Sequence, residues 1–163
     1  MSKTIMISGA SSGIGRTTAE YFQAKGWNVV ATMRAPEKET ELTELENVLV
    51  TRLDVQDSAS IEDAVTAGIA RFGKIDVLLN NAGYGAYGLL EATPNEKIRW
   101  QFDVNVIGLF ATTRAVLRSQ LFRSRRTSFK GDASGARPVG DPPAVARSAP
   151  RAACSHTPAV LSK

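Results

Sequence analysis

The residues best suited to chemistry lie near the start of the chain, in the stretch Ser8-Gly9-Ala10-Ser11-Ser12-Gly13-Ile14-Gly15. An apolar run precedes this stretch and a helical pattern follows it, which predicts a glycine-rich turn between a strand and a helix. Gly9 permits the tight bend, Gly13 leaves space for a ligand beside the backbone, and Gly15 lets the helix lie close to its strand. The N–H groups of the first helical turn then form an anion site suited to a pyrophosphate.

Strands and helices alternate along the first 118 residues, and these elements must position the turn. The pattern predicts helices over Ile14–Lys25, Glu37–Glu46, Ser58–Phe72 and from Thr93 onward, and strands up to Ser8 and over Asn28–Thr32, Val48–Leu53 and Ile75–Leu79. The last strand is expected to be buried on both faces. Four repeats of strand and helix predict an α/β fold, a doubly wound parallel sheet with right-handed crossovers.

The last predicted helix is expected to begin with a capping box. Thr93 caps the free N–H groups, Pro94 takes the first helical position, and Glu96 reaches back to Thr93. Further along, apolar residues at helical spacing predict a buried stripe made of Ile98, Phe102, Val106, Leu109, Thr113, Val116 and Leu117.

The character of the chain changes after Arg118. Residues 1–118 carry 12 Lys and Arg against 14 Asp and Glu, a net charge of −2, whereas residues 119–163 carry 8 against 2, a net charge of +6. The second segment is rich in Ser, Ala, Arg and Pro without helical or strand periodicity, so it is expected to be mostly disordered. The sequence thus predicts a folded domain over residues 1–118 and a basic tail over residues 119–163.

Composition narrows the class of protein. The chain has 163 residues, of which 43% are hydrophobic and 22% charged, enough for one domain with a core. No apolar run reaches the roughly 20 residues that cross a bilayer and no signal peptide precedes the first strand, so a cytoplasmic protein without membrane contact is expected. Cys154 and His156 are the only residues of their types, and neither an internal disulfide nor a metal site is expected.

Four motifs resemble the short-chain dehydrogenase/reductase family. They are the turn Ser8–Gly15, Leu53-Asp54-Val55, Asn80-Asn81-Ala82-Gly83 and Asn105-Val106-Ile107-Gly108. The resemblance covers residues 3–118, the first half of a family member, and implies a truncated Rossmann-like domain. It also implies an oxidoreductase that transfers hydride between a nicotinamide cofactor and an alcohol or ketone. Residues 83–108 resemble most the members that act on steroids, retinoids and other hydrophobic substrates, with Tyr84 and Tyr87 as candidates for the substrate mouth.

The turn and the end of the second strand define the expected cofactor. The backbone from Ser11 to Gly15 is expected to hold the pyrophosphate, with Ile14 against the ribose and nicotinamide side. Arg34 lies where an acidic residue would repel a ribose 2′-phosphate, so NADP is favoured over NAD, with a solvated loop arginine as the alternative. Ser12 occupies the position at which some family members carry a second phosphate-binding cation, and Arg16 is the candidate to replace it in part.

Residues after the third and fourth strands complete the predicted cofactor site. The resemblance implies that Asp54, next to Val55, accepts a hydrogen bond from the adenine amino group; a helix cap or turn residue is the alternative. Asn81 is expected either to tie strand ends together through its amide or to combine that role with cofactor contact. Ala82 and Gly83 leave room for the ribose.

Catalysis in this family uses an Asn, a Ser, a Tyr and a Lys. Asn105 matches the asparagine, which in the family holds a water that relays protons; a buried amide with satisfied hydrogen bonds is the alternative. No tyrosine follows Tyr87, and Ser134 lacks a preceding strand. Tyr21 and Lys25 have the Tyr-x-x-x-Lys spacing but lie on the first predicted helix, so the pair is interpreted as a coincidence. A catalytically impaired chain is therefore expected.

Three functions stay open on the sequence alone. The first is an NADP-dependent oxidoreductase acting on a small-molecule alcohol or ketone, and the second is a nucleotide-binding or interaction protein without turnover. The third, nucleic-acid binding by the tail, is weaker because only Phe122 and Phe129 offer stacking there. Family members pair through two helices, of which this chain keeps one at most, so a homo-oligomer is not the expectation. The strand Ile75–Leu79 is expected at a sheet edge.

Overall fold

The computed structural model describes residues 2–128, with side chains as far as Leu121. Its sheet consists of strands β1 (Thr4–Ser8), β2 (Asn28–Met33), β3 (Val48–Arg52) and β4 (Val77–Leu79). All neighbouring strands are parallel, in the order β3-β2-β1-β4, and Ile5 pairs with both Val29 and Val77. The crossover order therefore reverses at β1, which places the ends of β1 and β4 side by side.

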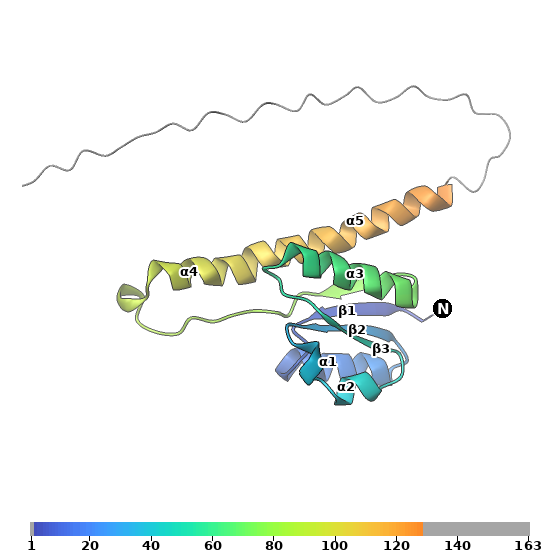
Figure 1. The fold of residues 1–163 in the computed structure, drawn as a ribbon, viewed down its shortest axis with the longest axis horizontal. Coiled ribbons are helices and arrows are strands. Elements are labelled where there is room, and N and C mark those ends of the chain that lie inside the picture. Colours follow the sequence, from blue (N-terminus) through green and yellow to red (C-terminus); the bar gives the residue numbers. More distant parts are fainter. Residues whose placement is uncertain (1, 129–163) are drawn as a thin grey trace, which may run out of the picture. The chain divides into compact units, whose positions relative to one another are not determined.

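Helices cover both faces of this sheet (Figure 1). Helices α1 (Gly13–Ala24) and α2 (Glu41–Glu44) pack on one face, and α3 (Ser58–Phe72) and α5 (Leu109–Ser128) pack on the other. Helix α3 has the predicted bounds, because Asp57 accepts hydrogen bonds from the first free N–H groups and Gly73 ends the helix in the left-handed conformation, at φ 81°.

Successive residues of β1 point into two separate apolar layers. Ile5 and Ile7 pack with Leu42 and the residues of α1, whereas Met6 packs with Ile61 of α3 and with Val116 of α5. This alternation is the period of a strand with both faces buried. The predicted α/β doubly wound fold is confirmed.

The predicted helix Glu37–Glu46 is wrong in extent. The structure divides this stretch into a 3₁₀ turn, η1 (Pro36–Lys38), and the four-residue helix α2. Leu42 is the only buried side chain of α2, so the segment has no apolar stripe that a longer helix could bury.

The fourth strand also differs from its prediction. It begins at Val77 and not at Ile75, because the carboxylate of Asp76 accepts a hydrogen bond from the backbone N–H of Thr4 at 2.8 Å. It is not buried on both faces: Val77 is 39% exposed. Within the described residues β4 forms one edge of the sheet, as expected for a strand without a further neighbour.

The helix after Pro94 does not start with a capping box. Helix α4 (Asn95–Phe102) begins one residue beyond Pro94 and has no side-chain cap. The hydroxyl of Thr93 donates instead to the carbonyl oxygen of Leu89 at 2.8 Å, at the end of the 3₁₀ turn η2 (Leu90–Ala92). This competing backward bond removes the predicted cap.

A π-helical segment, η3 (Asp103–Gly108), lies between α4 and α5 and changes which residues face inward. The buried positions along this stretch are Val104, Gly108, Thr112 and Val116. Most of the predicted stripe is therefore wrong, since Phe102 is 60% exposed and Val106, Leu109 and Leu117 are exposed as well. A wider helical turn shifts the register of the apolar residues that follow it.

Helix α5 continues to Ser128, so regular structure does not end near Arg118 as predicted. The Nε2 group of Gln120 donates to the carbonyl oxygen of Ile75 at 3.0 Å, which joins this part of α5 to the segment before β4. The predicted disorder of the tail falls on residues outside the described range, as do Cys154 and His156. Among residues 2–128, no helix has the length and apolar character needed to cross a membrane.

Candidate functional site

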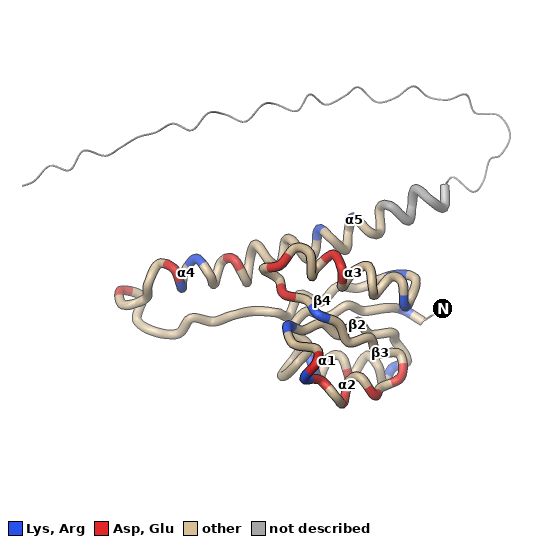
Figure 2. The backbone as a smooth tube through the Cα atoms, viewed as in Figure 1, with Lys and Arg blue, Asp and Glu red and all other residues tan. Residues whose placement is uncertain are grey.

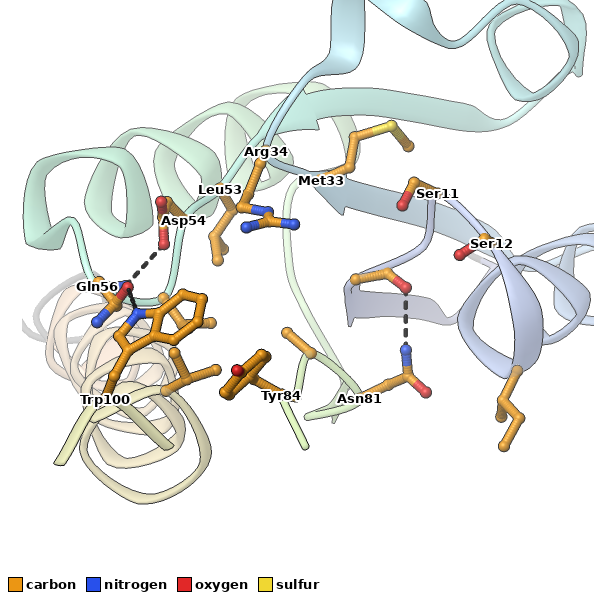
Figure 3. A pocket seen from close by; sticks show the side chains of 16 residues that line it. Ser11, Ser12, Met33, Arg34, Leu53, Asp54, Gln56, Asn81, Tyr84 and Trp100 are labelled. Atoms are coloured by element: carbon orange, nitrogen blue, oxygen red, sulfur yellow. Dashed lines mark hydrogen bonds between the residues drawn. The ribbon is translucent and has the colours of Figure 1, made fainter. Parts of the chain in front are cut away.

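A pocket of about 570 Å³ opens at the carboxyl end of the strands (Figure 3). It is lined by Gly9, Ser11, Ser12, Ile14, Met33, Arg34, Leu53, Asp54, Val55, Gln56, Asn81, Ala82, Gly83, Tyr84, Trp100 and Val104. Ten of the predicted cofactor-binding residues are in this set. Of the other predicted site residues, Gly13 and Gly15 lie in the adjoining turn, and Asn105 lies outside the lining.

The turn after β1 has the geometry that its glycines predict. The φ angles of Gly9 (71°) and Gly13 (55°) fall in the left-handed region. A Cβ on Gly15 would collide with the carbonyl oxygen of Gly9, whereas the space beside Gly13 is open. The side chain of Ser12 does not cap α1. The first N–H groups of α1 are therefore not taken by a side-chain cap, as an anion site requires.

Ser8 and Asn81 fasten β1 to the loop after β4. The Oγ atom of Ser8 accepts hydrogen bonds from the backbone N–H groups of Asn81 (3.0 Å) and Ala82 (3.1 Å). In return, Asn81 Nδ2 donates to the carbonyl oxygens of Ser8 (3.1 Å) and Gly9 (3.0 Å), while Asn80 Nδ2 donates to a threonine hydroxyl of α5 at 3.0 Å. Both asparagines thus tie strand ends together, and a cofactor contact of Asn81 stays a prediction.

Asp54 lies at the opposite end of the pocket from the turn after β1, as Figure 3 shows. Its Oδ1 atom accepts the backbone N–H of Gln56 at 3.0 Å, and Asp57 caps α3 in its place. Trp100 lines the same end: its Nε1 donates to Gln56 Oε1 at 2.7 Å, and its ring lies 4.1 Å from that of Tyr84 between centroids. Asp54 therefore shapes a turn and still leaves Oδ2 unbonded among the described residues.

Among the described residues, Arg34 is the only Lys or Arg in the pocket lining. Its side chain is exposed, and Figure 3 shows the guanidinium directed into the space between the turn and Asp54. Within residues 2–128 it forms no hydrogen bond or ion pair. Because a guanidinium binds phosphate through two parallel N–H groups, this side chain is available for an anionic ligand.

Arg16 does not replace the missing second cation, contrary to the expectation above. Its guanidinium is bonded to the carboxylates of Glu20, Glu39 and Glu41, and it does not line the pocket. Partial desolvation lowers the pKa of Arg16, but the three carboxylates outweigh that effect and hold the pKa above its ordinary value. The side chain is therefore committed to acidic partners of its own chain.

Asn105 lies in η3, and both ends of its amide are bonded to the backbone of Tyr84. Its Oδ1 accepts the Tyr84 N–H at 2.8 Å, and its Nδ2 donates to the Tyr84 carbonyl oxygen at 2.7 Å. A Cβ on Gly83 would lie 3.4 Å from Asn105 Oδ1. The asparagine therefore fixes the loop after β4 against η3, in the satisfied arrangement considered as its alternative, and its catalytic role stays a prediction.

Three of the remaining candidates, Tyr21, Lys25 and Tyr87, do not line the pocket. Tyr21 and Lys25 are at the C-terminal end of α1, with Lys25 Nζ 5.7 Å from the Tyr21 ring centroid, and neither lines it. Tyr87 is 99% exposed and does not line it either, whereas Tyr84 does. Ser134 falls outside the described residues. No group of three or more His, Cys, Asp or Glu within residues 2–128 could hold a metal ion.

Sequence reasoning missed five residues that line the pocket: Met33, Leu53, Gln56, Trp100 and Val104. Three of them had a local signal, because Met33 precedes Arg34, Leu53 precedes Asp54 and Val104 precedes Asn105. Trp100 had none, since its contacts at the pocket, the hydrogen bond to Gln56 and the ring contact with Tyr84, are with other segments of the chain.

A parallel sheet that reverses its strand order at a glycine-rich turn, with a pocket at that point, defines a Rossmann-type α/β domain. The sequence profile of the short chain dehydrogenase family matches residues 3–128. This chain belongs to that family, which confirms the resemblance and extends it beyond Arg118.

Individual relatives agree with the family assignment. The chain is 47% identical over 93 residues to an uncharacterised oxidoreductase of Schizosaccharomyces pombe, covering 57% of this chain and 39% of the relative. It is 38% identical over 125 residues to the NADP-dependent 3-hydroxy acid dehydrogenase YdfG of Salmonella typhi, covering 74% and 50%. Among solved structures, the actinorhodin polyketide ketoreductase with NADPH has a TM-score of 0.70 at 31% identity, with 76% of this chain and 49% of that chain covered. The chain thus spans about half or less of the length of these relatives.

Proposed function

We propose that this chain binds NADP(H) and forms the cofactor-binding half of an NADP-dependent oxidoreductase. The proposal rests on Arg34, which has no partner among the described residues and lies in a pocket that also contains the first turn of α1, which has no side-chain cap. A cation suits a ribose 2′-phosphate and free backbone N–H groups suit a pyrophosphate. NADPH bound there would donate a hydride to a ketone substrate, and NADP+ bound there would accept a hydride from an alcohol substrate.

In this proposal, different pocket residues bind different parts of the cofactor. The backbone N–H groups from Ser12 to Gly15 bind the pyrophosphate, and Arg34 binds the 2′-phosphate. Asp54 accepts from the adenine amino group through its unbonded Oδ2, while Asn81 and Gly83 adjoin the ribose. NADP or NADPH is named with two similar structures, ElxO and the polyketide ketoreductase, which supports this choice of cofactor.

Turnover is a separate part of the proposal. The proton donor expected for the family, a tyrosine four residues before a lysine in the second half, does not occur in the 163 residues. The contacts of Asn105 with Tyr84 favour a positioning role for that asparagine. We therefore propose that the first candidate, an NADP-dependent oxidoreductase, turns over weakly. It would act on a hydrophobic alcohol or ketone in the cytoplasm. The second candidate is a nucleotide-binding protein without catalysis.

Titration of the full chain with NADPH, followed by nucleotide fluorescence, tests the proposal with a matched pair of glycine variants. Gly13 and Gly26 both have positive φ angles, 55° and 76°, and open space where a Cβ would lie. Gly13→Val and Gly26→Val therefore carry similar backbone strain, but only the first places an isopropyl group at the proposed phosphate site. We expect Gly13→Val to weaken binding about tenfold or more, a loss of ~1.4 kcal/mol, and Gly26→Val to bind as the wild type does. Unsaturable binding by the wild type, or equal binding by both variants, would contradict the proposal.

A further inference from the structure

The connection between β2 and α2, residues 34–40, begins at Arg34. Near its other end, Glu39 is bonded to Arg16 of α1. Arg16 Nη1 donates to Glu39 Oε2 at 3.1 Å, and Arg16 Nη2 donates to Glu39 Oε1 at 3.4 Å, so the contact is bidentate. Nη2 also bonds to Glu41 at 2.7 Å and Nε to Glu20 at 3.1 Å. Figure 2 shows acidic and basic positions of the chain close together at α1 and α2.

Glu39 is the central member of this group. Its side chain is only 7% exposed, and its Oε1 atom also accepts the backbone N–H of Leu42 at 3.0 Å. Leu42 is fully buried in the apolar layer under α1. A nearly buried carboxylate that loses its cation is costly, so the pair with Arg16 determines where this carboxylate lies.

The same bonds restrain the segment that starts at Arg34. Backbone N–H groups of Lys38 and Glu39 donate to the carbonyl oxygens of Ala35 (3.3 Å) and Pro36 (3.1 Å), so η1 is a closed turn between Arg34 and Glu39. One end of the turn leaves the buried strand β2, and the other end is fixed by the Arg16–Glu39 pair. Within the described part of the chain, the Arg34 side chain has no hydrogen-bond or ion-pair partner that would hold it in place.

We propose that Arg16 is a positioning residue for recognition of the 2′-phosphate: it binds Glu39, and through Glu39 it holds the segment that presents Arg34 to the pocket. The inference rests on the proposed NADP(H) site and adds the residue that preorganises it. A ligand that needs one arrangement of Arg34 binds less tightly when that arrangement is only partly populated. NADH lacks the 2′-phosphate, so its affinity should not depend on Arg34 and therefore should not depend on Arg16.

The test measures dissociation constants of the full chain for NADPH and NADH in Arg16→Met and Glu39→Gln variants. Both variants are expected to lower the preference for NADPH over NADH about fivefold or more, with NADH affinity within about twofold of the wild type. Glu20→Gln and Glu41→Gln remove the two more exposed carboxylates and serve as controls, with the preference unchanged. In an Arg34→Met background, Arg16→Met should produce no further change, because the two residues act through one contact.

Glu39→Gln separates this role from direct phosphate binding. If Arg16 bound the 2′-phosphate itself, releasing it from Glu39 would tighten NADPH binding, and that result would overturn the proposal. An equal loss of NADPH and NADH affinity in both variants would show that Arg16 has only a structural role, and that result would also overturn the proposal. A wild-type chain that binds neither nucleotide would instead refute the proposed function, and the inference would fall with it.

Discussion

Replacing Ser8 by alanine tests whether the pocket depends on the bonds between β1 and the loop after β4. Ser8 is 1% exposed, and its Oγ accepts the backbone N–H groups of Asn81 at 3.0 Å and Ala82 at 3.1 Å. Its own hydroxyl points to the carbonyl oxygen of Leu79 at the longer distance of 3.5 Å. The Ser8→Ala variant therefore leaves two backbone donors without their acceptor and loses one weak donor bond.

The expected loss in the free energy of unfolding is about 2 to 3 kcal/mol. An unsatisfied buried N–H group costs about 1 to 3 kcal/mol, and both groups here adjoin the pocket, where water reduces the cost toward the lower value. NADPH affinity should fall in the same variant, because the two N–H groups fix the loop that carries Ala82 and Gly83 along the pocket wall.

Urea unfolding followed by circular dichroism gives the first quantity, and nucleotide titration gives the second. Ser119→Ala is the matched control, because the Ser119 hydroxyl donates to the Val116 carbonyl oxygen within α5 and accepts no backbone N–H. The control should lose less than about 0.5 kcal/mol, as is usual for substitutions away from special features. Equal losses in the two variants, or a Ser8→Ala chain with unchanged NADPH affinity, would refute the reasoning.

Two other substitutions follow from the same contacts. Asn105→Ala removes both bonds to the Tyr84 backbone, and we expect it to lower the free energy of unfolding by about 1 to 3 kcal/mol and to weaken NADPH binding; unchanged urea midpoints would contradict this. For Asp76, burial raises the pKa, but the bonds from Lys74 and the Thr4 N–H lower it more, so the folded pKa lies below the ordinary value. The Asp76 carboxylate therefore stabilises the fold fully above the unfolded pKa of about 4, and this stabilisation is lost as pH falls through the folded pKa. The Tm values of the wild type and Asp76→Asn should differ near pH 6 and converge in strong acid.

The glycine-rich turn was predictable because its geometry is local. The positive φ angles at Gly9 and Gly13 and the close approach at Gly15 follow from residue type and spacing within a few positions of the chain. Arg34 and Asp54 were predictable for a related reason: each follows a strand, and parallel strands that share a sheet bring their carboxyl ends to one edge.

The errors occur where a distant or unusual backbone feature decides the outcome. A regular helix would bury Phe102, Val106 and Leu109, but the π-helical segment η3 turns Val104 and Gly108 inward. Gly108 fits there because a Cβ would come within 2.7 Å of Val55 Cβ. Neither the wider turn nor this contact is visible in hydrophobic periodicity, which assumes one fixed period.

Arg16 is a charged residue whose partner could likewise not be predicted from the sequence. Its position next to the turn suggested a phosphate ligand, and the sequence held no sign that Glu39, 23 residues away, would take its guanidinium. In the fold the cation that follows the turn is paired with carboxylates of its own chain, and the cation that lines the pocket without a partner among the described residues is Arg34, after β2.

We expect cofactor binding and turnover to be separable in this chain. The contacts that shape the pocket join β1, the loop after β4, η3 and the connection after β2, and all of these lie within residues 2–128. None of them needs the part of the relatives' length that this chain does not match. The described residues therefore contain the whole lining of the proposed nucleotide pocket, and among them apolar side chains such as Phe110 stay exposed along α5, in that case by 58%. We therefore expect the chain to bind the nucleotide in proportion to the fraction that stays folded, so that NADPH itself should raise Tm with concentration, by mass action on the native state. A Tm that does not move at concentrations that saturate the nucleotide fluorescence would mean that binding does not require this fold.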